Sequence, residues 1–238
     1  MGNRLEQIAK SYDRHFIEYG QKDSLSYDNL PEYITNDPDY HKWKAECDGK
    51  DIDSESIIDI KNYLLPEKGM KFIHLGCSVN LMTKGYDKWP SLYHGVDISR
   101  ETIQLLNNFV KENKLSIGSL HCGSVHSTPF EDSYFDIGDC VGVLEYYEKE
   151  FVEEAIKEFN RIMKPNGRFV LDIPNIKSPN GRVMMLIEEC TGRPDKFNML
   201  PQEFENMIEK YFVIEKTNRI LAEKHGYMAM IYCLQCKK

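Results

Sequence analysis

The sequence predicts an α/β protein, built on a doubly wound, mostly parallel sheet that ends in an antiparallel hairpin, with an N-terminal helical lid. Three observations support this fold class. From residue 54 onward, apolar strand-like segments alternate with amphipathic helix-like segments, which is typical of parallel strands joined by right-handed crossovers. Near the C-terminus, two strand-like segments follow each other with no helix between them, which indicates a hairpin. The first fifty or so residues follow neither pattern, so we expect a lid over residues 1–53 and the main domain over residues 54–238.

Composition and charge exclude several classes of protein. The chain has 238 residues, of which 41% are hydrophobic and 29% charged, values typical of a globular protein with a real core. A formal net charge of −8 disfavours a nucleic-acid partner. The sequence contains no apolar run of membrane-spanning length and no signal-peptide pattern, and its seven cysteines favour reduced thiols. We therefore expect a cytoplasmic protein with no membrane or nucleic-acid partner, and the oligomeric state stays open.

The N-terminal segment divides into two parts. Residues 1–20 have apolar side chains near helical spacing, at Leu5, Ile8, Tyr12 and Phe16, which predicts an amphipathic helix. Residues 21–53 are polar and rich in turn-forming residues, with aromatic side chains such as Tyr40 and Trp43 among them. We expect this second part to be a flap over the main domain rather than part of its core.

Within residues 54–238, the sequence predicts a series of helices and strands. Ser54 can cap a helix that carries Ile60 and Leu64 and ends before Pro66. Ser99 caps a second helix, and a third, striped by Phe151 to Ile162, ends at the segment 164–167. The predicted parallel strands cover residues 71–75, 92–97, 117–122, 135–144 and 168–173. A helix opened by Pro201 and two strands over residues 211–221 and 226–236 complete the chain.

A turn and a carboxylate suggest where the chemistry lies. Gly76 follows the first strand, and Asp97 ends the second strand 21 positions later. In dinucleotide-binding folds such a turn lets the backbone approach a ligand, and the acid accepts hydrogen bonds from ribose hydroxyls. An ordinary strand-to-helix turn with an unrelated Asp is an equal alternative, because the glycine pattern is incomplete.

Several segments together resemble the class I S-adenosylmethionine-dependent methyltransferases of the small-molecule type. The segment Gly95-Val96-Asp97-Ile98-Ser99 is similar to the family's second-strand motif. The most specific match is the segment from Glu158 to Arg168, which is similar to the family's Glu-x-x-Arg-x-Leu-Lys-Pro-Gly-Gly. The resemblance covers residues 54–175 and extends weakly to residue 236. It implies a Rossmann-like sheet, S-adenosyl-L-methionine as cofactor and a small-molecule methyl acceptor.

The resemblance also implies a set of cofactor-binding residues. Asp97 corresponds to the acid that binds the adenosine ribose, and Tyr12 resembles the N-terminal Tyr of a Tyr-Asp pair. Gly76, Cys77 and Ser78 form the turn. Ser124 and Val125 occupy the positions at which members of the family contact the adenine of the cofactor. The full predicted set is Tyr12, His74, Gly76, Cys77, Ser78, Asp97, Ile98, Ser124, Val125 and Val141.

The sequence departs from the family pattern at the first turn. His74, Gly76, Ser78 and Asn80 stand where the family has acid-x-Gly-x-Gly-x-Gly, so one glycine remains. Ser and Asn still permit a close turn, since Asn tolerates left-handed backbone. His74 replaces an acid that lies near the methionine amino group. Its imidazole either takes that place or points away and packs under the following helix.

Methyl transfer from a sulfonium needs positioning and exclusion of water, without a metal or a covalent enzyme intermediate. A hydroxyl or ammonium acceptor must also lose a proton, and the candidate bases are Tyr146, Glu145 and His126 at predicted strand ends. For Glu145 a structural role is the competing interpretation, and for His126 simple solvation is. No metal site is predicted, because Cys233 and Cys236, three apart on a strand, face opposite sides.

Two other functions stay open on the sequence alone. A degenerate methyltransferase fold that binds a nucleoside or a partner protein without turnover is favoured by the eroded glycine motif and by His74. An NAD-dependent oxidoreductase shares Asp97 but does not explain the C-terminal hairpin. S-adenosylmethionine-dependent methyl transfer is the leading hypothesis.

Overall fold

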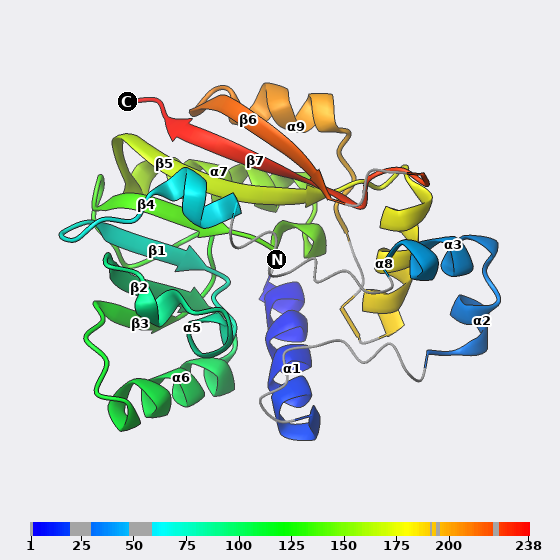
Figure 1. Ribbon diagram of the computed structural model, residues 1–238, viewed down its shortest axis with the longest axis horizontal. Coiled ribbons are helices and arrows are strands. Elements are labelled where there is room, and N and C mark those ends of the chain that lie inside the picture. The colour runs from blue at the N-terminus through cyan, green and yellow to red at the C-terminus, as the bar shows by residue number, and fades with distance from the viewer. Residues whose placement is uncertain (1, 20–29, 48–58, 191, 194–195, 221–223) are drawn as a thin grey trace.

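Seven strands form one sheet in the order β3-β2-β1-β4-β5-β7-β6 (Figure 1). The computed structural model describes residues 2–19, 30–47, 59–190, 192–193, 196–220 and 224–238. The parallel strands are β1 (Lys71–Leu75), β2 (Leu92–Asp97), β3 (Ser119–Cys122), β4 (Phe135–Cys140) and β5 (Met163–Pro174). The antiparallel strands are β6 (Phe212–Ile220) and β7 (Ala229–Cys236), and β7 lies between β5 and β6. This confirms the predicted mostly parallel sheet with a terminal hairpin.

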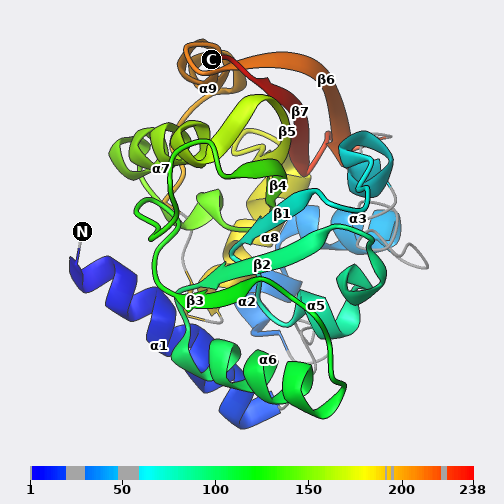
Figure 2. The same cartoon turned by 90° about the vertical axis from the view of Figure 1, so that its left-hand side faces the viewer.

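Helices cover both faces of the sheet (Figure 2). One face packs against α7 (Lys149–Ile162) and α9 (Pro201–Ile208), whose buried residues include Phe159 and Phe204. The other face packs against the helical residues 59–64, α5 (Asn80–Thr83), η2 (Tyr86–Lys88) and α6 (Arg100–Glu112). The Ser99 hydroxyl accepts a hydrogen bond from the Thr102 amide, so the predicted helix cap is confirmed. Ser54, the other predicted cap, lies outside the described residues.

The N-terminal elements lie at the carboxyl edge of the parallel strands. In Figure 1 the arrowheads of β1, β4 and β5 point toward α1 (Gly2–Tyr19), α8 (Pro179–Cys190), α2 (Glu32–Thr35) and α3 (Pro38–Cys47). The predicted first helix is thus confirmed, and it stands where doubly wound sheets bind ligands.

Residues 21–53 were expected to form a flap rather than part of the core, and the second half of this expectation is wrong for the described residues 30–47. Tyr40 and Trp43 on α3 are 5% and 3% exposed, and they form a small core with Val183 and Ile187 of α8. Their aromatic side chains were interpreted as lid residues because polar neighbours hide the short helical repeat. The sequence did not predict helix α8.

Two strand boundaries also differ from the predictions. β4 ends at Cys140 rather than at residue 144, because Gly142 takes a left-handed φ of +71° and the short helix η3 (Leu144–Tyr146) follows. β5 begins at Met163, directly after α7, rather than at Arg168. The thiols of Cys233 and Cys236 pack into cores on opposite faces of the sheet, as their spacing predicted. No helix in the described part of the chain is long and apolar enough to cross a membrane.

Candidate functional site

The turn after β1 brings backbone into close contact with the next strand. The amides of Gly76 and Cys77 both donate hydrogen bonds to the carbonyl of Val96, at 2.8 and 2.9 Å. Gly76 has a φ of +73°, and a Cβ atom there would lie 2.2 Å from Val143 Cγ2, so only glycine fits. Ser78 has a φ of +40° and keeps a left-handed conformation without being glycine. The predicted close turn therefore forms.

Asp97 joins this turn to the end of β2. Its Oδ2 accepts a hydrogen bond from the Ser78 amide at 2.8 Å, and its Oδ1 accepts one from the Ser99 amide at 2.9 Å. The side chain is only 6% exposed. Two backbone N–H donors orient the carboxylate, so it is pre-positioned at the carboxyl edge of the sheet.

His74 takes the second of the two positions that the sequence left open. It lies beneath α5, where its Nδ1 is 3.0 Å from Asp139 Oδ1 and its Nε2 is 3.3 Å from the Asn80 side-chain nitrogen. Its ring centroid lies 4.7 Å from that of Tyr86, and the imidazole is 2% exposed. Its role toward a cofactor stays a prediction, but both ring nitrogens face polar atoms of the protein, and the contact of Nδ1 with Asp139 lacks hydrogen-bond geometry.

The end of β3 contributes a second group of predicted residues. Ser124 Oγ lies 2.7 Å from His126 Nδ1, and the His126 ring is 4.8 Å from the ring of Phe151. Ile98 and Val125 pack into the core on the α7 face. Val141 packs into the core on the opposite face, so the structure does not bring it to these two residues.

Helix α1 covers the carboxyl edge through three contacts. Asp13 Oδ1 accepts a hydrogen bond from the Ser99 hydroxyl at 2.6 Å, which ties α1 to the start of α6. The Arg4 guanidinium donates two hydrogen bonds to the Tyr146 carbonyl, at 3.2 and 3.0 Å. Ile8, between them, is 1% exposed. Asp13 follows the predicted Tyr12, and that Tyr-Asp pair was the available signal for it.

Tyr12 and Tyr146 meet under this cover. Their hydroxyls are 3.5 Å apart and their rings pack edge to face. The guanidinium of Arg193 lies 4.6 Å from the centre of the Tyr12 ring, a cation–π contact. Burial raises the pKa of Tyr12 to about 12 and raises that of Tyr146 well above its usual value. Both phenols therefore stay protonated at neutral pH. Arg193 had no signal in the sequence beyond being a single basic residue in a loop.

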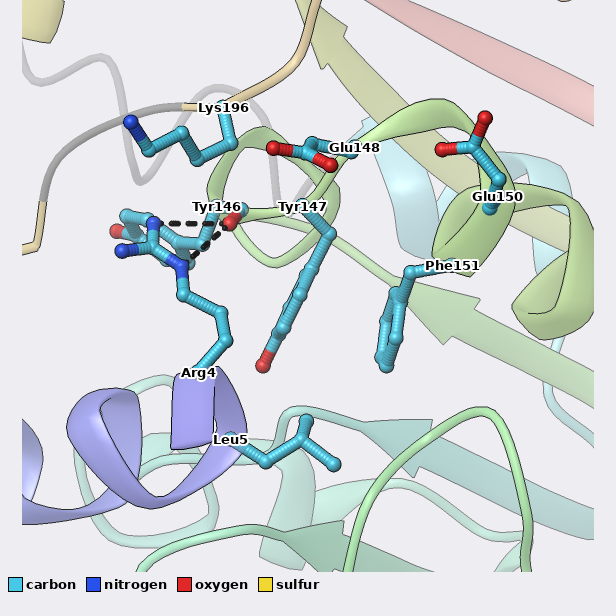
Figure 3. Close-up of a pocket in the computed structure, with 8 residues that line it drawn as sticks. All are labelled: Arg4, Leu5, Tyr146, Tyr147, Glu148, Glu150, Phe151 and Lys196. Atoms are coloured by element: carbon cyan, nitrogen blue, oxygen red, sulfur yellow. Dashed lines mark hydrogen bonds between the residues drawn. The ribbon is translucent and has the colours of Figure 1, made fainter. Parts of the chain in front are cut away.

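A cavity of about 280 Å³ opens between α1 and the segment after β4 (Figure 3). Leu5, Tyr147 and Phe151 form its apolar wall, and the last two rings stack with centroids 3.8 Å apart. The side chains of Arg4, Tyr146, Glu148, Glu150 and Lys196 complete the lining. Glu145 lies next to this cavity, and its backbone carbonyl accepts the amides of Lys196 and Phe197. The mixed lining suits a small organic molecule.

The motif from Glu158 to Arg168 has a structural role. Glu158 Oε1 accepts hydrogen bonds from the amide and hydroxyl of Thr128, at 2.7 and 2.6 Å, and Arg161 pairs with the same carboxylate. Burial acts to raise the pKa of Glu158, but the hydrogen bonds from Arg161 and Thr128 outweigh it, so that pKa is lowered. The motif thus fixes the loop that follows Ser124 and Val125.

Comparisons with known proteins agree with this geometry. Residues 73–171 match the family described as the methyltransferase domain. The uncharacterized methyltransferase YcgJ of Bacillus subtilis (strain 168) is 31% identical over 77 residues, which are 32% of this chain and 30% of the relative. A ubiquinone biosynthesis O-methyltransferase of Coxiella burnetii is 25% identical over 108 residues, 45% of each chain. The matches thus span less than half the length of these curated relatives.

The fold extends further than the sequence match. The solved structure of geranyl diphosphate C-methyltransferase from Streptomyces coelicolor A3(2) superposes with a TM-score of 0.67. It covers 98% of this chain and 97% of its own, at 13% identity. The whole described architecture, including α1 and the terminal hairpin, is therefore similar in fold to that protein.

Proposed function

We propose that this chain transfers a methyl group from S-adenosylmethionine to a small-molecule acceptor, because residues 73–171 match the methyltransferase-domain family. The observation that carries the proposal is the left-handed turn at Gly76 and Ser78, whose amide is bound by Asp97 at the carboxyl edge. The degenerate binding module is less favoured, because the turn keeps its close conformation although two of its three glycines are replaced. An oxidoreductase does not account for the family match of residues 73–171.

The residues present fit S-adenosylmethionine. The missing Cβ of Gly76 lets Val143 pack against the turn, and the φ of +73° at Gly76 keeps the turn in its close conformation. Asp97 offers an oriented carboxylate for ribose hydroxyls, while Ile98 and Val125 offer apolar contact for a base. When bound, S-adenosylmethionine supplies an electrophilic methyl group on a sulfonium. The protein's part is to hold the two reactants in line and to exclude water.

The residues of the cover determine what happens around the acceptor. Tyr146 stays a neutral phenol and is not a base at neutral pH, because burial raises its pKa well above its usual value. Glu145 and His126 are then the proposed bases for an acceptor that must lose a proton. The closed α1 excludes water from this edge through the contacts of Arg4, Ile8 and Asp13.

We extend the proposal to the organisation of the chain. Residues 54–238 form the catalytic domain and residues 1–53 its lid, with α1 over the cofactor and α2–α3 held against α8. The acceptor is a small molecule, which the cavity of Figure 3 can hold in part. A cytoplasmic location and the absence of a nucleic-acid partner stay predictions from the sequence.

Calorimetry with two ligands tests the proposal. We expect S-adenosylhomocysteine to bind with one site per chain and NAD to release no heat. A radiolabelled-methyl assay against phenolic, amine and thiol acceptors then detects turnover. Binding without transfer to any acceptor of these classes supports the binding module, and heat with NAD alone supports an oxidoreductase.

A further inference from the structure

A buried polar chain runs from β4 to the cofactor-binding turn. Tyr86 donates its hydroxyl to Asp139 Oδ2 at 3.0 Å, and Asp139 Oδ1 lies 3.0 Å from His74 Nδ1. On its other side the imidazole lies 3.3 Å from the Asn80 side-chain nitrogen. Asn80 is the first residue of α5, directly after the turn. The chain therefore joins the middle of the sheet to the backbone that meets the cofactor.

The strand register places the two central residues opposite each other. His74 of β1 and Asp139 of β4 are neighbours in the parallel pairing, and both side chains point to the α5 face. His74 is 2% exposed and Asp139 is fully buried. A buried carboxylate without a partner is costly, so its contacts with Tyr86 and His74 are needed for the fold. No sequence motif pairs these residues, which stand 65 positions apart.

The contacts fix the orientation of the imidazole. The Asn80 amide nitrogen can only donate, so Nε2 accepts and the proton of the ring is on Nδ1, which lies 3.0 Å from Asp139 Oδ1 but outside hydrogen-bond geometry. Burial raises the pKa values of Tyr86 and Tyr93, so the phenols beside the ring stay protonated. Burial does the same to the pKa of the neighbouring Cys77 thiol.

We propose that Asp139 acts through His74 to position Asn80, and with it the turn over residues 76–80 that holds S-adenosylmethionine. Asp139 and His74 are positioning residues, since neither touches the cofactor. The inference rests on the proposed function, because it assigns these residues to the affinity for that cofactor. The proposal also predicts the effect of His74→Asp. A second carboxylate at 74 would face Asp139, so the substitution weakens binding by repulsion rather than strengthening it.

Calorimetric titration of S-adenosylhomocysteine tests the proposal. We expect Asp139→Asn and His74→Gln each to raise the dissociation constant about fivefold or more. The double variant is expected to have a dissociation constant no higher than that of the weaker-binding single variant, because both substitutions interrupt the same series of contacts. Exchanging the pair, His74→Asp with Asp139→His, is expected to recover most of the affinity that His74→Asp alone loses. If the two substitutions act independently on the structure, their effects on the affinity would add instead, and exchanging the pair would not restore the affinity.

A matched control separates positioning from general stability. Glu205 accepts the Tyr232 hydroxyl at 3.1 Å, the same tyrosine–carboxylate contact made on the terminal hairpin. Glu205→Gln is expected to lower the melting temperature and leave the affinity for S-adenosylhomocysteine unchanged. Nitrogen-15 spectra of the histidines add a direct readout, in which Asp139→Asn shifts the His74 ring nitrogens.

The possible results separate the positioning role of Asp139 and His74 from the proposed function. If Asp139→Asn does not fold, Asn80→Ala at the half-buried end of the chain serves instead, with an expected loss of about threefold. Affinities within about twofold of the parent in the folded variants would overturn the positioning role. A parent protein that does not bind S-adenosylhomocysteine at all would contradict the proposed function itself, and the positioning role would fall with it.

Discussion

At the scale of single residues, the site depends on backbone amides that are held by carboxylates. Asp97 accepts the amides of Ser78 and Ser99, and Asp172 of β5 accepts the amide of Gly142 at 2.9 Å. Each carboxylate orients a turn at the carboxyl edge of a strand. Hydrogen bonds to an ionised carboxylate contribute more than neutral ones, about 1.5–3 kcal/mol each, wherever burial does not disfavour the charge.

Replacing Asp97 tests the ribose contact. Asp97→Ala is expected to weaken the binding of S-adenosylhomocysteine by about 1.5–3 kcal/mol, because the oriented carboxylate is lost. Calorimetry measures the change, and circular dichroism checks that the fold is retained. Asp132→Ala, at a carboxylate that is 77% exposed and paired with Arg161, is the control and should bind normally. Equal affinities in Asp97→Ala and the parent would remove Asp97 from the site.

Asp172 gives the fold a measurable pH dependence. Burial raises its pKa to about 6, above the usual value of about 3.9 for Asp. The folded state therefore favours the protonated acid, and this contribution to stability is lost as the pH rises through about 6. Asp172→Asn removes the effect and keeps an acceptor for Gly142. As the pH is raised from 4 to 7.5, we expect the free energy of unfolding of the variant to increase by about 1–3 kcal/mol relative to that of the parent. Urea unfolding at both pH values measures this, and parallel stability curves would contradict it.

At the scale of elements, the sequence predicted what depends on local pattern and missed what depends on contacts. The strand ends at Leu75 and Asp97 and the Ser99 cap were predictable, because apolar alternation and capping are written within a few residues. Helix α8 was not, since its apolar residues are buried by α3, about 140 positions earlier. The partnership of His74 with Asp139 was equally hidden, although a charged residue inside an apolar strand was a usable signal.

The contact between α2–α3 and α8 leads to a prediction at this scale. Arg182 on α8 pairs with Asp37 at 2.6 Å and with Asp39 at 2.7 Å. Hydrogen bonds from Arg182 lower the pKa of Asp37 to about 2, so the pairing persists in mildly acidic buffer. Arg182→Met is expected to speed amide hydrogen exchange in residues 32–47, with little change in melting temperature because half-exposed ion pairs contribute little. Unchanged exchange in α3 would show that the apolar contacts of Tyr40 and Trp43 hold it alone.

At the scale of the whole molecule, the site is closed by a segment that precedes the domain in sequence. Helix α1 crosses the carboxyl edge and reaches both α6, through Asp13, and the segment after β4, through Arg4 (Figure 1). Under the proposed function, a cofactor that binds beneath α1 requires this helix to move away and return. The sequence predicted the helix, and its role as a lid stays a prediction, whereas the contacts of Asp13 and Arg4 came only from the structure.

Hydrogen exchange with and without ligand tests the cover. Amide exchange in residues 2–19 is expected to slow when S-adenosylhomocysteine binds, because the bound state favours the closed helix. Asp13→Asn weakens the anchor at Ser99, so amide exchange in residues 2–19 should be faster than in the parent when no ligand is bound. Binding of S-adenosylhomocysteine should slow this exchange less in the variant than in the parent. Lys10→Gln, at an exposed pair with Glu6, is the matched control on the same helix. Equal protection of α1 in free and bound protein would count against a movable cover.

The position of β7 between β5 and β6 sets the order in which the chain can mature on the ribosome. β6 pairs with β7 and is separated by it from the rest of the sheet. When residues 212–220 emerge, their neighbour in the sheet has not yet been made, and β5 still presents an open edge. The facing edges of β5 and β6 become paired only after residues 229–236 have been synthesised and have inserted between these two strands. A nascent chain halted before residue 229 therefore exposes two unpaired strand edges, which are the surfaces that chaperones and aggregation compete for.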